Sequence, residues 1–223
     1  MQPLDAARER SAAALDKAAG TFDLKLSAQQ SDRLLAYLAL LAKWNQVYNL
    51  TAIRDPAEML VQHVFDSMAV VGPLRRWTQG RAVRLLDVGS GAGLPGLVLA
   101  VLMPEVDATC VDAVGKKAAF VREASATLGL TNLHSVHARV QKIDGSYDVV
   151  TSRAFASLAD FVSLTRHLCD ERGAWMAMKG RAPTDEIAAL PGDVSVFHVE
   201  RITVPGLDAE RCLVWMRRKD RGG

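Results

Sequence analysis

The sequence predicts a doubly wound α/β fold, with a mostly parallel sheet whose last strand is antiparallel and with a helical extension at the N-terminus. Three observations favour this class. Helical spacing dominates residues 1–80, strand-like and helical segments alternate over residues 81–223, and a glycine-rich turn joins the first strand to the next helix. Strands that alternate with helices form a parallel sheet covered on both faces. We therefore expect a helical N-terminal extension (1–80) and one α/β domain (81–223).

Two helix starts are visible in the first 80 residues. Ser27-Ala-Gln-Gln30 has the form of a capping box, and leucines follow it at helical spacing. Asp55-Pro56 combines an N-cap residue with proline at the first helical position. This second helix is expected to run to Gly72-Pro73, which would stop it. The tail before residue 20 is expected to be dispensable.

The strands and helices of the second part follow one another at short intervals. The predicted parallel strands are VRLLDVG (83–89), ATCVDA (108–113), LHSVHA (133–138), YDVVTSRA (147–154) and AWMAMKG (174–180). The predicted helices between them are 93–103, 116–129 and 157–168. Two further strands, 194–202 and 211–218, are too close in sequence for a crossover helix. They are therefore expected to pair antiparallel at one end of the sheet.

The composition excludes several classes of protein. The 223 residues are 49% apolar and 23% charged, with a formal charge of +2, which is typical of a soluble globular protein without a polybasic arm. Three widely spaced cysteines form no CxxC, so neither a disulfide framework nor a metal site is expected. The charged N-terminus does not read as a signal peptide, and no apolar run would span a bilayer. We expect a cytoplasmic protein without a membrane partner.

The glycine-rich turn is the strongest functional signal. It begins after an acidic residue, in the pattern Asp87-x-Gly89-x-Gly91-x-Gly93. Glycines let the turn tighten and let a ligand lie against the backbone, beyond the carboxyl ends of the strands. About 20 residues further on, the second strand ends at Asp112, whose carboxylate can accept both hydroxyls of a ribose. The pattern therefore indicates a nucleoside cofactor.

The identity of that cofactor depends on the details of the turn. Residues 91–96 also satisfy GxGxxG, so a dinucleotide enzyme or a purely structural turn stays an alternative. Pro95 lacks a backbone N–H where a pyrophosphate needs donors, and Asp87 precedes the glycines. S-adenosylmethionine carries no phosphate and does not need those donors. The D-x-G-x-G-x-G form is similar to the first motif of Rossmann-like methyltransferases.

Longer motifs resemble one family of such enzymes, the glucose-inhibited division protein B family. They are WNQVYNLT (44–51), HVFDS (63–67), DVGSGAGLPG (87–96), SRAFAS (152–157) and MKG (178–180), in the family's order, and the resemblance runs from about residue 25 to residue 216. It implies a Rossmann-like S-adenosylmethionine-dependent methyltransferase sheet with an N-terminal helical part. It also implies methylation of guanine 527 at N7 in the 16S ribosomal RNA of the small subunit, and low-level streptomycin resistance when the activity is lost.

Site residues follow partly from the resemblance and partly from the strand ends. The cofactor-binding set expected is Gly89, Gly91, Gly93, Leu94, Asp112, Val140, Gln141 and Arg153. Of these, Asp112 comes from the strand-end argument and Gly91 and Gly93 come from the turn, while the resemblance implies Gly89 and the others. The family often has an acid where this chain has Gln141, which favours a backbone contact there.

The resemblance also implies positively charged contacts to RNA, from Arg139, Lys179 and Arg211. Guanine N7 presents a lone pair and carries no proton, so no general base is required, and positioning with electrostatics suffices. We therefore name no residue as a certain catalyst and expect Arg139, Arg153 and Arg211 to position the substrate. His63 is read as a packing residue or a site residue, and the chain as a monomer. A small-molecule methyltransferase and a non-catalytic cofactor-binding protein remain alternatives.

Overall fold

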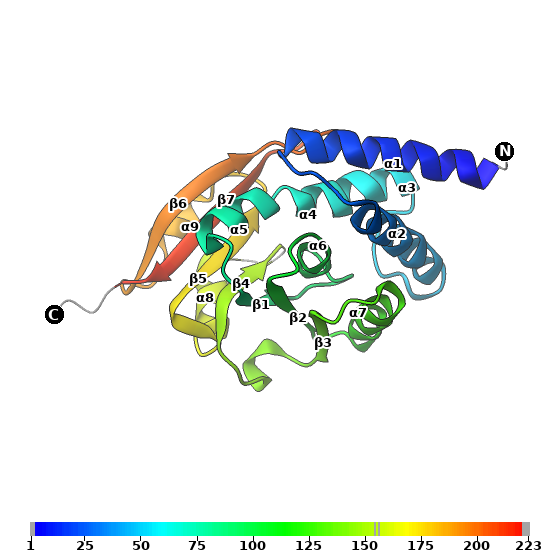
Figure 1. Cartoon of the computed structure of the whole chain (residues 1–223). Helices are drawn as coiled ribbons and strands as arrows, with labels where there is room; N and C mark the ends of the chain where they lie inside the picture. The colour runs from blue at the N-terminus through cyan, green and yellow to red at the C-terminus, as the bar shows by residue number, and fades with distance from the viewer. Residues whose placement is uncertain (1–2, 154, 156, 220–223) are drawn as a thin grey trace.

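A single seven-stranded sheet organises the computed structural model, which describes residues 3–153, 155 and 157–219 (Figure 1). Within these residues the strand order is β3-β2-β1-β4-β5-β7-β6. The strands are β1 Val83–Val88, β2 Val106–Asp112, β3 Leu133–His137, β4 Tyr147–Ser152, β5 Cys169–Lys179, β6 Val194–Ile202 and β7 Arg211–Arg218. The seven strands predicted from the sequence are all present.

The strand directions confirm the predicted fold class. The first five strands in sequence pair in parallel, with β1 between β2 and β4. The last strand, β7, lies between β5 and β6 and is antiparallel to both. From β1 the chain adds β2 and β3 on one side, and it then returns to add β4 and β5 on the other side of β1. In open α/β sheets such a switch point opens a crevice beyond the carboxyl ends of the strands, where ligands bind.

The three predicted helices of the second part lie between the strands as expected, and a short helix between β5 and β6 was not predicted. These helices are α6 Gly96–Leu102, α7 Gly115–Leu128, α8 Leu158–Thr165 and α9 Thr184–Ala188. Side chains alternate between the two faces along each strand, so Leu85 and Leu86 of β1 enter different apolar cores. The core on one face includes side chains of α6 and α7, and the core on the other includes side chains of α8. Both faces of the sheet are therefore covered.

The N-terminal helices pack against the sheet domain through a common core. They are α1 Pro3–Thr21, α2 Ala28–Tyr48, α3 Pro56–Met59, α4 Asp66–Met68 and α5 Val71–Thr78, with a π-helix at Leu60–Phe65 between α3 and α4. Leu34 and Tyr37 of α2 are fully buried in the same cluster as Leu97 and Phe120. Leu15 of α1 is also fully buried there. This burial argues against the expectation that the tail before residue 20 contributes nothing.

The structure confirms both predicted helix starts in this region, but the predicted helix end at Gly72-Pro73 is wrong. Ser27 and Gln30 form a complete capping box, and Asp55 caps α3 with Pro56 in its first turn. The expected stop at Gly72-Pro73 lies instead in the first turn of α5. Proline is tolerated there because the first turn of a helix makes no backbone hydrogen bond through that N–H. Among the described residues no helix is long and apolar enough to cross a membrane.

Candidate active site

The glycine turn after β1 has the geometry that only glycines adopt easily. Gly89, Gly91 and Gly93 have φ angles of 66°, 60° and 85°, in the left-handed region. The Gly91 N–H donates to Asp112 Oδ2 at 2.9 Å, and the Val114 N–H donates to Asp112 Oδ1 at 2.8 Å. The carboxylate at the end of β2 therefore ties the turn to the neighbouring strand. Each of its oxygens keeps a lone pair for a further hydrogen bond.

Asp87, in β1, binds the far end of the glycine-rich segment. Its carboxylate is completely buried, and its Oδ2 accepts a hydrogen bond from the Gly96 N–H at 2.8 Å. Burial raises the pKa of Asp87 to about 7, although the Gly96 N–H and the charge of Arg153 oppose that rise. A Cβ at Gly96 would lie 2.7 Å from Cys110 Sγ and 3.0 Å from Asp87 Oδ2. Glycine is therefore required for the helix to start this close to the sheet.

A cleft of about 230 Å³ lies beside the turn, at the carboxyl ends of β1 and β2. Its lining is Val88, Gly89, Val111, Asp112, Ala113, Ala138, Arg139, Val140, Gln141, Phe155 and Leu164. The walls are mostly apolar, and one carboxylate stands among them. A Cβ at Gly89 or Gly91 would meet no atom within 4 Å, so the backbone there is open to close approach. Apolar walls and a single acceptor fit an adenine ring with its ribose.

Four of the expected cofactor residues do not line this cleft, and the first of them, Gly91, contacts Asp112 of the lining through its N–H. Gly93 and Leu94 are buried, and a Cβ at Gly93 would lie 3.2 Å from Val121 Cγ2, so this glycine allows the turn to pack against α7. The fourth is Arg153, which lies in a different cleft. Ala154 and Ala156 of the SRAFAS motif lie outside the described residues. The cofactor roles of these positions stay predictions.

That second cleft, which we call the basic cleft, has a volume of about 330 Å³ and holds three cationic side chains. Arg153 follows β4, Lys179 ends β5 and Arg211 begins β7. Asp66, 2% exposed, accepts hydrogen bonds from Arg211 Nε at 2.9 Å and from Arg153 Nη1 at 3.4 Å. Arg153 Nη1 also donates to the Gln62 carbonyl at 2.9 Å. One buried carboxylate from the N-terminal helices thus fixes two arginines of the sheet domain.

His63 is among the residues that line the basic cleft, but its side chain is almost completely buried, as expected for a packing residue. Its Nε2 lies 3.2 Å from Thr51 Oγ1, and its Nδ1 is buried without a partner among the described residues. Burial, reinforced by the nearby charge of Arg153, lowers the pKa of His63 to about 4. The ring is therefore neutral at pH 7. Asn45 is also buried, and it bridges the Thr51 N–H and the Ile53 carbonyl, which is a structural role.

The structure separates the arginines that the sequence grouped together. Arg139 lines the apolar cleft beside Val140 and Gln141, and its side chain is exposed. Arg211 and Lys179 instead meet Arg153 in the basic cleft, where Lys179 Nζ also pairs with Glu186 Oε2 at 2.8 Å. Arg139 thus lies in the apolar cleft, and the other three cations lie in the basic cleft.

Two residues of the site were missed by sequence reasoning. Asp66 stands inside the HVFDS motif, so the motif contained the signal although no role was assigned to it. Tyr37 carried no signal, because it is one apolar position among several on α2. Its buried hydroxyl donates to the Ala92 carbonyl at 3.0 Å, so the N-terminal helices hold the glycine turn directly.

These features together define a class of protein. A five-stranded parallel sheet with an antiparallel strand inserted near one edge, a three-glycine turn after β1 and an acid at the end of β2 are those of a Rossmann-like S-adenosylmethionine-dependent methyltransferase. Comparison with known proteins gives the family. Residues 30–214 match the family model of rRNA small subunit methyltransferase G, and the chain belongs to that family.

Relatives and solved structures agree with this assignment. A ribosomal RNA small subunit methyltransferase G from Acidovorax ebreus is 59% identical over 212 residues, which cover 92% of this chain and 94% of that protein. Its counterpart from Leptothrix cholodnii is 62% identical over 193 residues, covering 86% and 88%. Burkholderia thailandensis 1,6-didemethyltoxoflavin-N1-methyltransferase, solved with S-adenosylhomocysteine, has a TM-score of 0.57 at 14% identity and covers 88% of this chain and 92% of its own. This last likeness shows the fold alone.

Proposed function

We propose that this protein transfers a methyl group from S-adenosylmethionine to N7 of guanine 527 in the 16S ribosomal RNA of the small ribosomal subunit. The observation that carries the proposal is the family match over residues 30–214, whose relatives are named for methylating small-subunit ribosomal RNA. The motifs shared with the glucose-inhibited division protein B family support guanine N7 as the acceptor. We further propose that the protein acts as a monomer in the cytoplasm, where its substrate is assembled.

The apolar cleft is the proposed cofactor site. When bound, S-adenosylmethionine supplies an electrophilic methyl group on its sulfonium. Asp112 would accept the ribose hydroxyls, Val140 and Gln141 would border the adenine, and Gly89 and Gly91 would let the cofactor lie against the backbone. The open space beyond the Cα atoms of both glycines and the apolar walls of the cleft support these roles.

The basic cleft is the proposed acceptor site. Because guanine N7 carries no proton, the residues around it need only hold the base and its phosphate in line with the methyl group. Arg153, Arg211 and Lys179 supply positive charge there, and Asp66 fixes the direction of the two guanidinium groups. An arginine that gripped N7 and O6 together would block the attacked atom, so we assign these side chains to O6 or to phosphate.

A covalent route through cysteine has no support in the structure. All three cysteines, Cys110, Cys169 and Cys212, are buried. Burial raises the pKa of each thiol, to about 12 in Cys169, so a nucleophilic thiolate is disfavoured at neutral pH. The acceptor nitrogen itself is then the nucleophile, as an N7 reaction requires.

Transfer of labelled methyl groups to small subunits from cells that lack the modification tests the proposal. We expect label in 16S ribosomal RNA and, after borohydride reduction and aniline treatment, a strand cut at guanine 527, because 7-methylguanosine is cationic and loses its base. The same cells are expected to show low-level streptomycin resistance. Label in a base that resists this cleavage would reject N7, and label in small molecules alone would reject the RNA substrate.

A further inference from the structure

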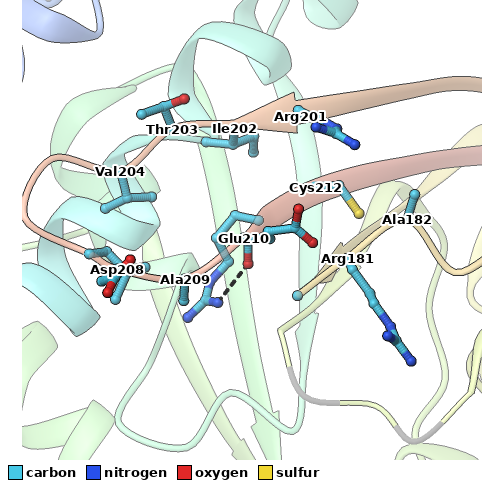
Figure 2. A pocket seen from close by; sticks show the side chains of 13 residues that line it. Arg181, Ala182, Arg201, Ile202, Thr203, Val204, Asp208, Ala209, Glu210 and Cys212 are labelled. Carbon is cyan, nitrogen blue, oxygen red and sulfur yellow. Dashed lines mark hydrogen bonds between the residues drawn. The ribbon is translucent and has the colours of Figure 1, made fainter.

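A groove next to the basic cleft is not used by the roles given so far. It has a volume of about 560 Å³, within the range of ligand sites, about 300–1,000 Å³. Figure 2 shows its walls: the end of β6 with the segment that continues it, the residues that lead into β7, and the segment after β5. The lining residues are Gly180–Ala182, Arg201–Val204 and Leu207–Cys212.

The groove continues the proposed acceptor site. Gly180 and Arg211 line both the groove and the basic cleft, so the two hollows meet at these residues. A strand whose target base occupies the basic cleft would therefore have its neighbouring nucleotides beside the groove. No part of the apolar cofactor cleft is shared with it, since the two lining sets have no residue in common.

The charge of the groove suits a polyanion. Arg181 and Arg201 are exposed, and neither side chain makes a hydrogen bond or an ion pair to another residue in the described part of the chain. Arg211 is the third cation, and Asp208 and Glu210 are the acids of the lining. Together with the basic cleft, the surface holds five Arg or Lys side chains against four carboxylates when the Glu186 that pairs with Lys179 is included. One of these four, Asp66, is already bonded to two arginines.

We propose that this groove binds the phosphate backbone of the RNA strand next to the methylated guanine, through Arg181 and Arg201. The proposal rests on the proposed function and adds to it the path of the RNA. Guanidinium groups match phosphate oxygens with two parallel donors. No aromatic side chain lines the groove on which a base could stack, so the contact is to phosphate and carries no sequence information of its own.

Charge reversal of both arginines tests the groove. We compare the wild type, R181E/R201E and the matched control R122E/R172E, whose exposed arginines lie on α7 and at the opposite end of β5. Methylation of unmodified small subunits is measured over a series of salt concentrations. For R181E/R201E we expect KM to rise at least fivefold, with kcat and the affinity for S-adenosylmethionine unchanged. The slope of log KM against log salt should fall by about 1.4, since each phosphate contact to a single strand contributes about 0.7.

The possible outcomes separate the two proposals. If the wild type methylates the subunit and R181E/R201E behaves like the control, the groove is overturned while the proposed function stands. If the wild type transfers no methyl group, the proposed function fails first. A photoreactive benzoylphenylalanine at position 181 identifies the occupant directly. Cross-links to 16S ribosomal RNA support the groove, and cross-links to a ribosomal protein in their place overturn it.

Discussion

At the scale of single residues, Gly91 joins two strand ends through its backbone. Its φ of 60° disfavours any side chain, and its N–H holds the carboxylate of Asp112. Gly91→Val should strain the turn, release Asp112 and narrow the space open to the cofactor. We expect calorimetry to show S-adenosylmethionine binding weakened at least tenfold, about 1.4 kcal/mol. Gly192→Val is the control, because Gly192 also has open space beyond its Cα but no left-handed φ. Equal losses in the two variants would place the cofactor elsewhere.

Asp66 is a positioning residue on the same scale. Asp66→Asn keeps the shape of the side chain but removes the charge that Arg153 and Arg211 share. Each guanidinium group then keeps a backbone carbonyl partner but loses the charge that holds the two groups together, so kcat/KM for the subunit is expected to fall at least tenfold. S-adenosylmethionine affinity should change less than threefold, because Asp66 does not line the apolar cleft. A loss of cofactor binding as large as the loss of methylation would show a structural role only.

At the scale of elements, local signals predicted most of the fold, and the exceptions have physical reasons. Short apolar, β-branched runs located the strands, because parallel strands covered on both faces of a sheet are apolar along most of their length. The helix after Asp55 was predicted to end at Gly72-Pro73, but the structure turns through a π-helix at Leu60–Phe65 and restarts at α5. A π-helix has no sequence pattern of its own, and it often marks functional positions. Asp66 follows it immediately.

The candidate site divides in the same way. The glycine turn and Asp112 could be predicted because their residue types are sufficient evidence. Glycine is the residue that adopts left-handed φ angles easily, and an acid at the end of a strand can bind a ribose. Tyr37 and the bridge from Asp66 to two arginines could not, because each depends on contacts between segments far apart in the chain. Arg139 and Arg211 were grouped through the family resemblance, and only the fold shows that they line different clefts.

Whether helix α1 contributes to stability can be tested directly. Leu15 is fully buried in the core shared with the sheet, whereas Lys17 on the same helix is exposed. Leu15→Ala should lower the free energy of unfolding by about 2–5 kcal/mol, the usual cost of emptying a buried leucine site. Lys17→Ala should change it by less than about 0.5 kcal/mol. Urea unfolding measures both. A neutral Leu15→Ala would restore the expectation that this helix is dispensable.

At the scale of the whole molecule, two buried groups make stability depend on pH in opposite directions. Burial raises the pKa of Asp87 to about 7 and lowers the pKa of His63 to about 4. Between pH 4 and 7 the folded chain keeps a proton on Asp87 that the unfolded chain has lost, so this contribution to stability falls as pH rises. Between pH 4 and 6.5 the unfolded chain holds a proton on His63 that the folded chain lacks, so this contribution rises with pH. The two trends offset each other in the wild type.

Asp87→Asn separates them, because asparagine keeps an oxygen for the Gly96 N–H but does not titrate. The free energy of unfolding of the wild type minus that of Asp87→Asn should decrease steadily from pH 4 to pH 7, by up to about 4 kcal/mol at 1.36 kcal/mol for each pKa unit. Every other titrating group, His63 included, cancels in this difference. Urea unfolding of both proteins at half-unit steps of pH provides the curve. A difference that stays constant, or that increases with pH, would mean that Asp87 is already ionised in the folded protein and that its burial is compensated by a partner.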